Sequence, residues 1–161
     1  MEDAGNVPDG FTRIERGGHF LGSLGPLYAK KTESGIVIAM RIEEKHLNTR
    51  GIAHGGMLVT LADSALGIAI ATSHADRAPA ERASTAAGAP PRAFVTVNLS
   101  VDFIASAHEG DFVEAHVDIE KVGARLAFAT CFLQVAKRRV LRASGVFATV
   151  APAKPKERFE G

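Results

Sequence analysis

The second half of the chain alternates apolar and polar residues with a period of two. Between residues 95 and 103 the odd-numbered positions are apolar and the even-numbered ones polar, and residues 113–120 repeat the pattern. Such alternation is typical of antiparallel strands with one buried and one polar face. Two further strand-like runs follow, the first apolar on both faces as in a central strand. We therefore predict four strands, over residues 94–103, 111–120, 125–136 and 139–150.

The first half of the chain predicts a hairpin and one long helix. Leu27–Thr32 and Ile36–Arg41 flank a turn with glycine at position 35, as strands of a hairpin do. Residues 54–72 are apolar on every helical face, which indicates a helix surrounded by protein. One helix wrapped by an antiparallel sheet of about six strands is the simplest packing of these elements, and it gives an α+β fold.

The length of 161 residues fits a single domain. We expect a lead-in segment over residues 1–25, one domain over 26–151 and a charged tail over 152–161. The stretch 73–92 is rich in Ala, Pro, Arg and Ser, which makes it a poor helix and excludes a strand. We predict a long loop there and favour disorder over a mobile lid.

Composition excludes several classes of protein. A formal charge of +1, without a basic stripe interleaved with aromatic residues, gives no support for a nucleic-acid partner. The N-terminus has no apolar signal core, and the single cysteine, Cys131, cannot form an internal disulfide, so we expect a cytoplasmic protein. The apolar run 52–71 contains His54, Asp63 and three glycines, which favours a buried helix over a membrane span.

Asp63 is the first candidate for chemistry, because it lies in the middle of the longest apolar stretch of the chain. Burying a carboxylate is costly unless hydrogen bonds or charges compensate it. The start of the same helix is a second candidate. No Ser, Thr, Asp or Asn occupies the cap position before Met57, and Gly55 and Gly56 let another group come close. Free N–H groups at the positive end of a helix dipole favour an anion or oxyanion.

The spacing of these two candidates predicts a homodimer. Eight residues separate Gly55 from Asp63, which is about 12 Å along one helix. A single reacting carbonyl group cannot touch both residues of the same chain. Two antiparallel helices of a two-fold dimer would bring Asp63 of one copy beside Gly55 of the other. The neighbouring helix terminus would also help to keep the carboxylate ionised.

These residues resemble a known family. Asn48-x-x-Gly51-x-x-His54-Gly55-Gly56 followed by Asp63 is similar to the motif of the hotdog-fold acyl-CoA thioesterases of the PaaI-like and acyl-thioesterase-13 type. The resemblance runs from about Gly25 to Thr149 and includes Val95–Leu99, Lys121–Phe128 and Ala143–Thr149. It implies a hotdog fold in which a long helix is wrapped by an antiparallel sheet, paired into homodimers and often into tetramers, as dimers of dimers.

The resemblance also implies a role for each motif residue. Asp63 matches the catalytic carboxylate, acting as general base on water or as nucleophile on the thioester carbonyl. Gly55 matches the glycine whose N–H polarises that carbonyl. Asn48 matches the asparagine that orients water or substrate, and His54 matches a positioning histidine. Thr96 aligns with a hydroxyl-bearing strand residue that supports the carboxylate, although an ordinary residue of a polar strand face remains an alternative.

Further residues are candidates for contact with an acyl-CoA substrate. Gly56 and Ser64 lie next to the two catalytic candidates in the chain. Arg125 and Arg138 are candidates for the phosphates of CoA, although a solvated basic turn is the simpler interpretation of each. The other histidines have no metal-ligand spacing, and no dinucleotide or Walker motif occurs, so we expect neither a metal nor a cofactor.

Three functions remain open from the sequence. The leading hypothesis is an enzyme that hydrolyses acyl-CoA, or a related acyl thioester, to a free carboxylic acid and a thiol. A hydratase or dehydratase of an enoyl thioester would use the same fold, but the loop characteristic of hotdog hydratases is missing. A non-catalytic acyl-CoA binding module is the third possibility, and it would bind the ligand without turnover.

Overall fold

The computed structural model describes residues 7–15, 18–82 and 93–151. Two helices and a short 3-10 helix, η1, accompany seven strands in this part of the chain. The helical elements are α1 (Gly18–Leu24), η1 (Glu44–His46) and α2 (Gly55–Arg82). The strands are β1 (Thr12–Ile14), β2 (Leu27–Thr32), β3 (Gly35–Arg41), β4 (Ala93–Phe103), β5 (Phe112–Val122), β6 (Leu126–Val135) and β7 (Arg138–Val150).

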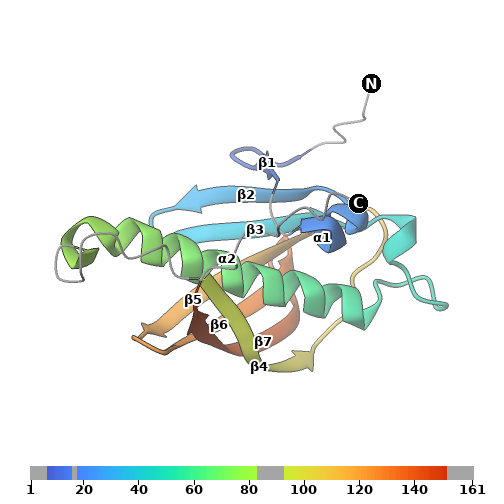
Figure 1. The fold of residues 1–161 in the computed structure, drawn as a ribbon. Helices are drawn as coiled ribbons and strands as arrows, with labels where there is room; N and C mark the ends of the chain where they lie inside the picture. Colours follow the sequence, from blue (N-terminus) through green and yellow to red (C-terminus); the bar gives the residue numbers. More distant parts are fainter. Residues whose placement is uncertain (1–6, 16–17, 83–92, 152–161) are drawn as a thin grey trace, which may run out of the picture.

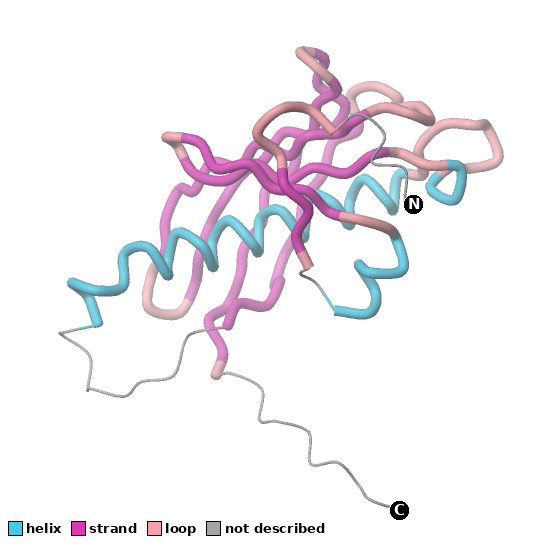
Figure 2. Tube along the Cα trace, turned by 90° about the horizontal axis from the view of Figure 1, so that it is seen from above, coloured by secondary structure: helices cyan, strands magenta, loops and turns pink. Residues whose placement is uncertain are grey.

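All seven strands form one antiparallel sheet in the order β1-β2-β3-β5-β6-β7-β4. The sheet curves around α2, which crosses one of its faces (Figures 1 and 2). The predicted arrangement of one long helix and an antiparallel sheet is therefore confirmed, with one strand more than expected. The last strand in the order, β4, has one free edge among the described residues.

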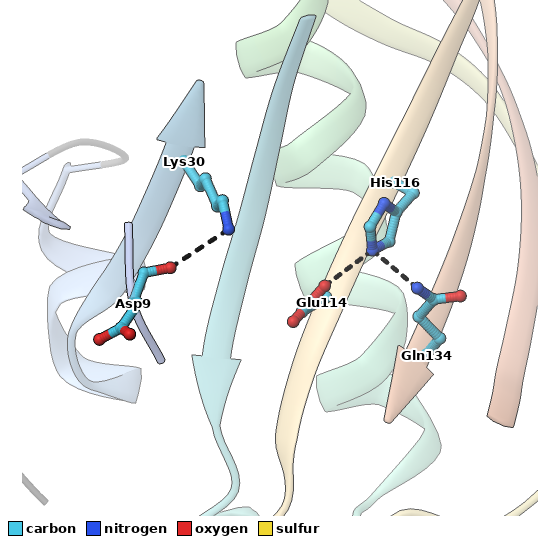
Figure 3. A network of polar contacts seen from close by, with 5 residues as sticks. All are labelled: Asp9, Lys30, Glu114, His116 and Gln134. Atoms are coloured by element: carbon cyan, nitrogen blue, oxygen red, sulfur yellow. Dashed lines mark hydrogen bonds and ion pairs between the residues drawn. The ribbon is translucent and has the colours of Figure 1, made fainter. Parts of the chain in front are cut away.

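The extra strand lies in the segment that we expected to be a lead-in. β1 pairs with β2, and Lys30 Nζ of β2 donates a hydrogen bond of 3.2 Å to the carbonyl oxygen of Asp9 (Figure 3). After β1, the helix α1 places Leu21 in the hydrophobic core, where its side chain is 8% exposed. Parts of the first 25 residues thus belong to the folded domain.

The helix α2 differs from the prediction in two ways. It continues to Arg82, so the prediction of a loop is wrong for residues 73–82, whereas residues 83–92 lie outside the described part of the chain, as does the tail 152–161. Extending an existing helix avoids the cost of nucleation, and alanine, frequent in this stretch, is the best helix former.

The second difference concerns the surroundings of α2, because only one face of the helix is fully buried within a single chain. Its buried positions pack on the sheet and include Leu58, Leu61, Ala62, Ala65, Leu66 and Ile70. The opposite positions are partly exposed and include Val59, Thr60, Asp63, Ser64, Gly67 and Ile68. By length and composition, Gly55–Ala75 could cross a membrane, but its buried positions form the core with the sheet.

A bulge in β4 overturns the simple alternation that we expected for this strand. Thr96 pairs with Phe147 and Asn98 with Val146, so Val97 is an extra residue between them. Beyond the bulge the apolar residues Leu99 and Phe103 lie towards α2, and before it Thr96 does so. The prediction that Thr96 shares a polar face with Asn98 is therefore wrong. The bulge turns its hydroxyl group towards the helix.

Candidate active site

A hydrogen bond joins the two strongest polar candidates of the helix and the sheet. Thr96 Oγ1 on β4 donates to Asp63 Oδ1 on α2 over 2.7 Å. The bond holds one carboxylate oxygen, and no described residue donates to the other. Because the carboxylate is only partly buried, it can receive water while Thr96 fixes its orientation.

This pair lies in the wall of a cavity of about 470 Å³ between α1, α2 and β4. That volume is in the range of sites for small molecules. The lining residues are Phe20, Leu21, Val59, Thr60, Asp63, Ser64, Thr96 and Leu99. Half of the lining is apolar, and Asp63 is the only charged residue among the described residues that form it. The cavity therefore suits an uncharged apolar group next to the Asp63 carboxylate.

The turn into α2 has a cap that the sequence did not predict. Gly56 N–H donates to His54 Nδ1 over 2.9 Å, and the His54 carbonyl accepts from Met57 N–H over 2.9 Å. Because Nδ1 is an acceptor, a neutral His54 carries its proton on Nε2. In the described part of the chain no acceptor meets Gly55 N–H. The expectation of several free N–H groups is wrong, and one remains, at Gly55.

Two contacts explain the glycines of this turn. A Cβ atom at Gly55 would lie 3.1 Å from the ring of Phe103, and one at Gly56 would lie 3.1 Å from the ring of His54. Both distances are tighter than ordinary van der Waals contact. The Gly55 N–H therefore lies at a place where only a residue without a side chain fits easily.

Asn48 begins the tight turn that precedes the helix. Its carbonyl accepts from Gly51 N–H over 2.9 Å, and its side-chain oxygen accepts from Arg50 N–H over 2.8 Å. Gly51 has a φ of +73°, which a side chain would disfavour. In one chain Asn48 thus has the contacts of a turn residue. Its amide nitrogen has no partner among the described residues.

The remaining candidates are spread over the molecule. Ser64 lines the cavity, and its hydroxyl donates to the Thr60 carbonyl over 2.7 Å. Arg125 precedes β6, whereas Arg138 follows it, and a ten-residue strand separates the two by roughly 30 Å. Arg138 already donates to the Ser106 carbonyl over 2.7 Å. Within one chain the two arginines therefore cannot hold the same phosphate.

Two groups of residues at or near this site carry no signal in the sequence. Phe20 and Leu21 of α1 line the cavity although they lie in the expected lead-in segment. His46 is 2% exposed and accepts from Glu43 N–H over 2.9 Å, while its Nε2 lies 2.5 Å from the Leu24 carbonyl. A short helix without an N-cap signal and a histidine in an irregular stretch left no pattern that could have identified them.

Comparison with known proteins places the chain in a family. The family model of the thioesterase superfamily matches residues 50–141. The chain belongs to this superfamily. A Pseudomonas aeruginosa protein named as a candidate esterase is 42% identical over 143 residues, covering 88% of this chain and 96% of the relative. Mouse acyl-coenzyme A thioesterase 13 is 30% identical over 95 residues, covering 59% of this chain and 57% of the relative.

A solved structure agrees with this assignment at the level of the fold. A variant of the phenylacetic acid degradation protein PaaI from Thermus thermophilus superimposes with a TM-score of 0.63 at 24% identity, covering 81% of this chain and 98% of that structure. The hotdog-type thioesterase fold and the resemblance to the PaaI-like and acyl-thioesterase-13 proteins are confirmed. The family and its named members support the hydrolysis of thioesters as the general reaction of this protein.

A polar cluster elsewhere on this thioesterase is separate from the site. His116 Nε2 lies 2.8 Å from Glu114 Oε2 and 2.8 Å from Gln134 Nε2, on the face of the sheet turned away from α2 (Figure 3). The neighbouring residues Val113 and Ala115 face the core instead. His116 therefore takes no part in the arrangement around Asp63.

Proposed function

We propose that this thioesterase hydrolyses an acyl-CoA, or a closely related acyl thioester, to a free carboxylic acid and a thiol. The observation that carries the proposal is the Asp63 carboxylate, oriented by Thr96 in the wall of a half-apolar cavity. The name of the mouse relative supports CoA as the thiol part. Membership of the thioesterase superfamily favours hydrolysis over hydration and over binding without turnover.

The reaction needs a base or nucleophile and an electrophilic partner. Acting as general base, Asp63 takes a proton from water, whose oxygen attacks the thioester carbonyl carbon. The negative charge on the carbonyl oxygen is stabilised by Gly55 N–H at the positive end of α2. The C–S bond then breaks, and the leaving thiolate receives the proton. In a nucleophilic variant, Asp63 attacks the carbonyl itself, and water cleaves the resulting anhydride.

The proposed active site needs two copies of the chain. Gly55 and Asp63 are about 12 Å apart along α2, so the pair that acts on one carbonyl must come from different copies. The unpaired edge of β4 supports this assembly, because it exposes Val95, Val97 and Phe103 to between 47% and 60%. A long apolar edge strand is a template for pairing with another strand. The partly exposed face of α2 would be covered by the same contact.

In this dimer the remaining candidates fall into supporting roles. The amide nitrogen of Asn48 is proposed to bind the attacking water or the substrate, while its oxygen holds the turn. His54 caps α2 through Gly56 and so orients the adjacent N–H of Gly55. Arg125, which is exposed, is the better candidate for a CoA phosphate, because Arg138 is engaged with Ser106.

Release of free thiol from a panel of acyl-CoA substrates tests the proposed function. We expect Asp63→Asn to lower kcat by roughly 10²- to 10⁴-fold, which is the usual contribution of a general base, without a change in the melting temperature. Asp118→Asn is the matched control, because Asp118 is a carboxylate on β5 that lies outside this cavity. Full activity of the Asp63→Asn enzyme would mean that the carboxylate is structural.

Mixing two inactive variants tests the shared site. Gly55→Pro removes the N–H group at the first helical position, where the backbone conformation suits proline, and the exposed ring of Phe103 must move to admit the new side chain. In a mixed dimer of Gly55→Pro and Asp63→Asn chains, one of the two sites keeps both original groups. We expect activity to return on mixing after reversible unfolding. No recovery, with both variants folded and dimeric, would contradict a site made by two chains.

A further inference from the structure

We propose that α1 is the selective wall of the acyl pocket, with Phe20 and Leu21 restricting this enzyme to uncharged apolar acyl groups and Phe20 limiting their length. The inference rests on the proposed thioesterase function and adds the substrate class. It concerns residues outside the matched family region, which begins at residue 50.

The position of Phe20 favours an apolar ligand. Its side chain is 63% exposed, the largest value among the exposed large hydrophobic residues of the described chain, although it lines the cavity beside Asp63. An apolar ring left in water forgoes the stabilisation that burial gives. An acyl chain in the cavity would cover the ring and recover part of this stabilisation.

Contacts at the end of α1 make this wall a fixed one. Leu21 is buried in the core, and the Leu24 carbonyl lies 2.5 Å from Nε2 of the buried His46. The backbone carbonyl of His46 also accepts from His54 N–H over 2.8 Å. The same residue thus connects α1 to the turn that presents Gly55. The pocket wall and the proposed oxyanion site are held by one buried histidine.

The direction of the acyl chain follows from the lining. The reacting carbonyl must lie at Asp63, and the apolar lining begins one helical turn earlier at Val59, about 6 Å along α2. On β4, Leu99 lies about 7 Å beyond Thr96, because the bulged Val97 adds no rise between them. Both elements lead towards the N-terminal half of α2, beside which α1 lies (Figure 1). An acyl chain that follows them therefore meets Phe20.

The charge of the lining selects against acyl groups that end in a carboxylate. The described lining contains no Lys, Arg or His, and its single charged residue, Asp63, is negative. A second carboxylate in the cavity would lose its hydration and face a like charge without a cation. Butanoyl-CoA and succinyl-CoA have acyl groups of similar length, but only the succinyl group ends in a carboxylate. The two substrates therefore differ in charge, the property that this wall discriminates.

The test measures kcat/KM for butanoyl-, octanoyl-, hexadecanoyl- and succinyl-CoA by release of free thiol. We expect wild-type enzyme to prefer butanoyl-CoA to succinyl-CoA by roughly 100-fold or more. We expect Phe20→Ala to raise the ratio of kcat/KM for hexadecanoyl-CoA to that for butanoyl-CoA by about tenfold or more, because each methylene in an apolar pocket contributes about that factor. Phe20→Trp should lower the same ratio.

The control is Phe128→Ala, which truncates another exposed phenylalanine, in β6, that does not line the cavity. The kcat/KM values of this control for the four substrates should match those of the wild type. An unchanged ratio in both Phe20 variants, or equal turnover of succinyl- and butanoyl-CoA, would overturn the inference while leaving the thioesterase function intact. Absence of turnover with every substrate would overturn the proposed function, and the inference with it.

Discussion

Separate substitutions at His46 can test which of its two ring contacts holds α1. Nδ1 accepts from Glu43 N–H within the capping box of η1, and Nε2–H donates to the Leu24 carbonyl at the end of α1. The ring is 2% exposed, so water cannot replace either contact easily. Asparagine places its amide oxygen near the position of Nδ1, whereas glutamine places its amide nitrogen near that of Nε2.

Each variant loses one of the two buried contacts, so the two should lose comparable stability but differ in where the chain becomes more mobile. His46→Asn keeps the contact to Glu43 and loses that to Leu24, which leaves a carbonyl without its donor at a cost of about 1–3 kcal/mol. In a chain of this size that cost lowers the melting temperature by roughly 3–10 °C. His46→Gln keeps the contact to Leu24. Amide hydrogen exchange in residues 18–24 should accelerate in His46→Asn and much less in His46→Gln.

Thermal unfolding gives the melting temperature of each variant. Amide hydrogen exchange followed by mass spectrometry gives the local mobility of residues 18–24 on the same samples. The acyl-length profile of each variant adds a functional readout, because a loosened α1 should accept longer chains. Equal exchange of residues 18–24 in the two variants would refute the reasoning, since the contact between His46 and Leu24 would then have no role in holding the helix.

Three further outcomes follow from single contacts. Thr96→Val should lower kcat/KM by roughly 10- to 100-fold because the Asp63 carboxylate loses its donor, while Thr130→Val on β6 leaves it unchanged. Gly145→Val should destabilise the fold by about 1–3 kcal/mol in urea unfolding, because a Cβ atom there would lie 3.0 Å from Leu66 Cδ1. Burial raises the pKa of Cys131 from 9.0 to about 12. The unfolded thiol ionises above pH 9 and the folded one does not, so this contribution to stability is complete below pH 9 and is lost as the pH rises towards 12. The difference in unfolding free energy between wild type and Cys131→Ala, measured at about pH 8 and about pH 10.5, should show this loss.

The parts of the fold that repeat a pattern were predictable from the sequence. Alternation with a period of two located the bounds of β4 and β5 to within two residues, and Glu33–Gly35 marked the turn between β2 and β3. The isolated carboxylate at position 63 identified the charged residue of α2 that lines the cavity. Each of these signals comes from residues near one another in the chain, where local physical chemistry decides the outcome.

Features that depend on distant parts of the chain were not predictable. α1 has seven residues and is held by Leu21 in the core and by His46, which is more than twenty residues away. The helix α2 reaches Arg82 because its packed N-terminal part has already formed, so the following residues extend it without a cost of nucleation. The cap at Gly56 comes from a histidine, which is outside the usual set of capping residues.

The bulge at Val97 connects the chemistry of β4 to its edge. Without the bulge, a strand that kept Val97 in regular alternation would place Thr96 on the face opposite to Leu99 and Phe103, away from Asp63. With it, the hydroxyl group reaches the carboxylate, while Val95 and Val97 are left exposed at the end of the sheet. Exposed valines on an edge strand are costly in a lone chain and favourable in the proposed dimer. A single local irregularity therefore supplies both the support of the proposed catalytic carboxylate and an apolar surface for the proposed second copy.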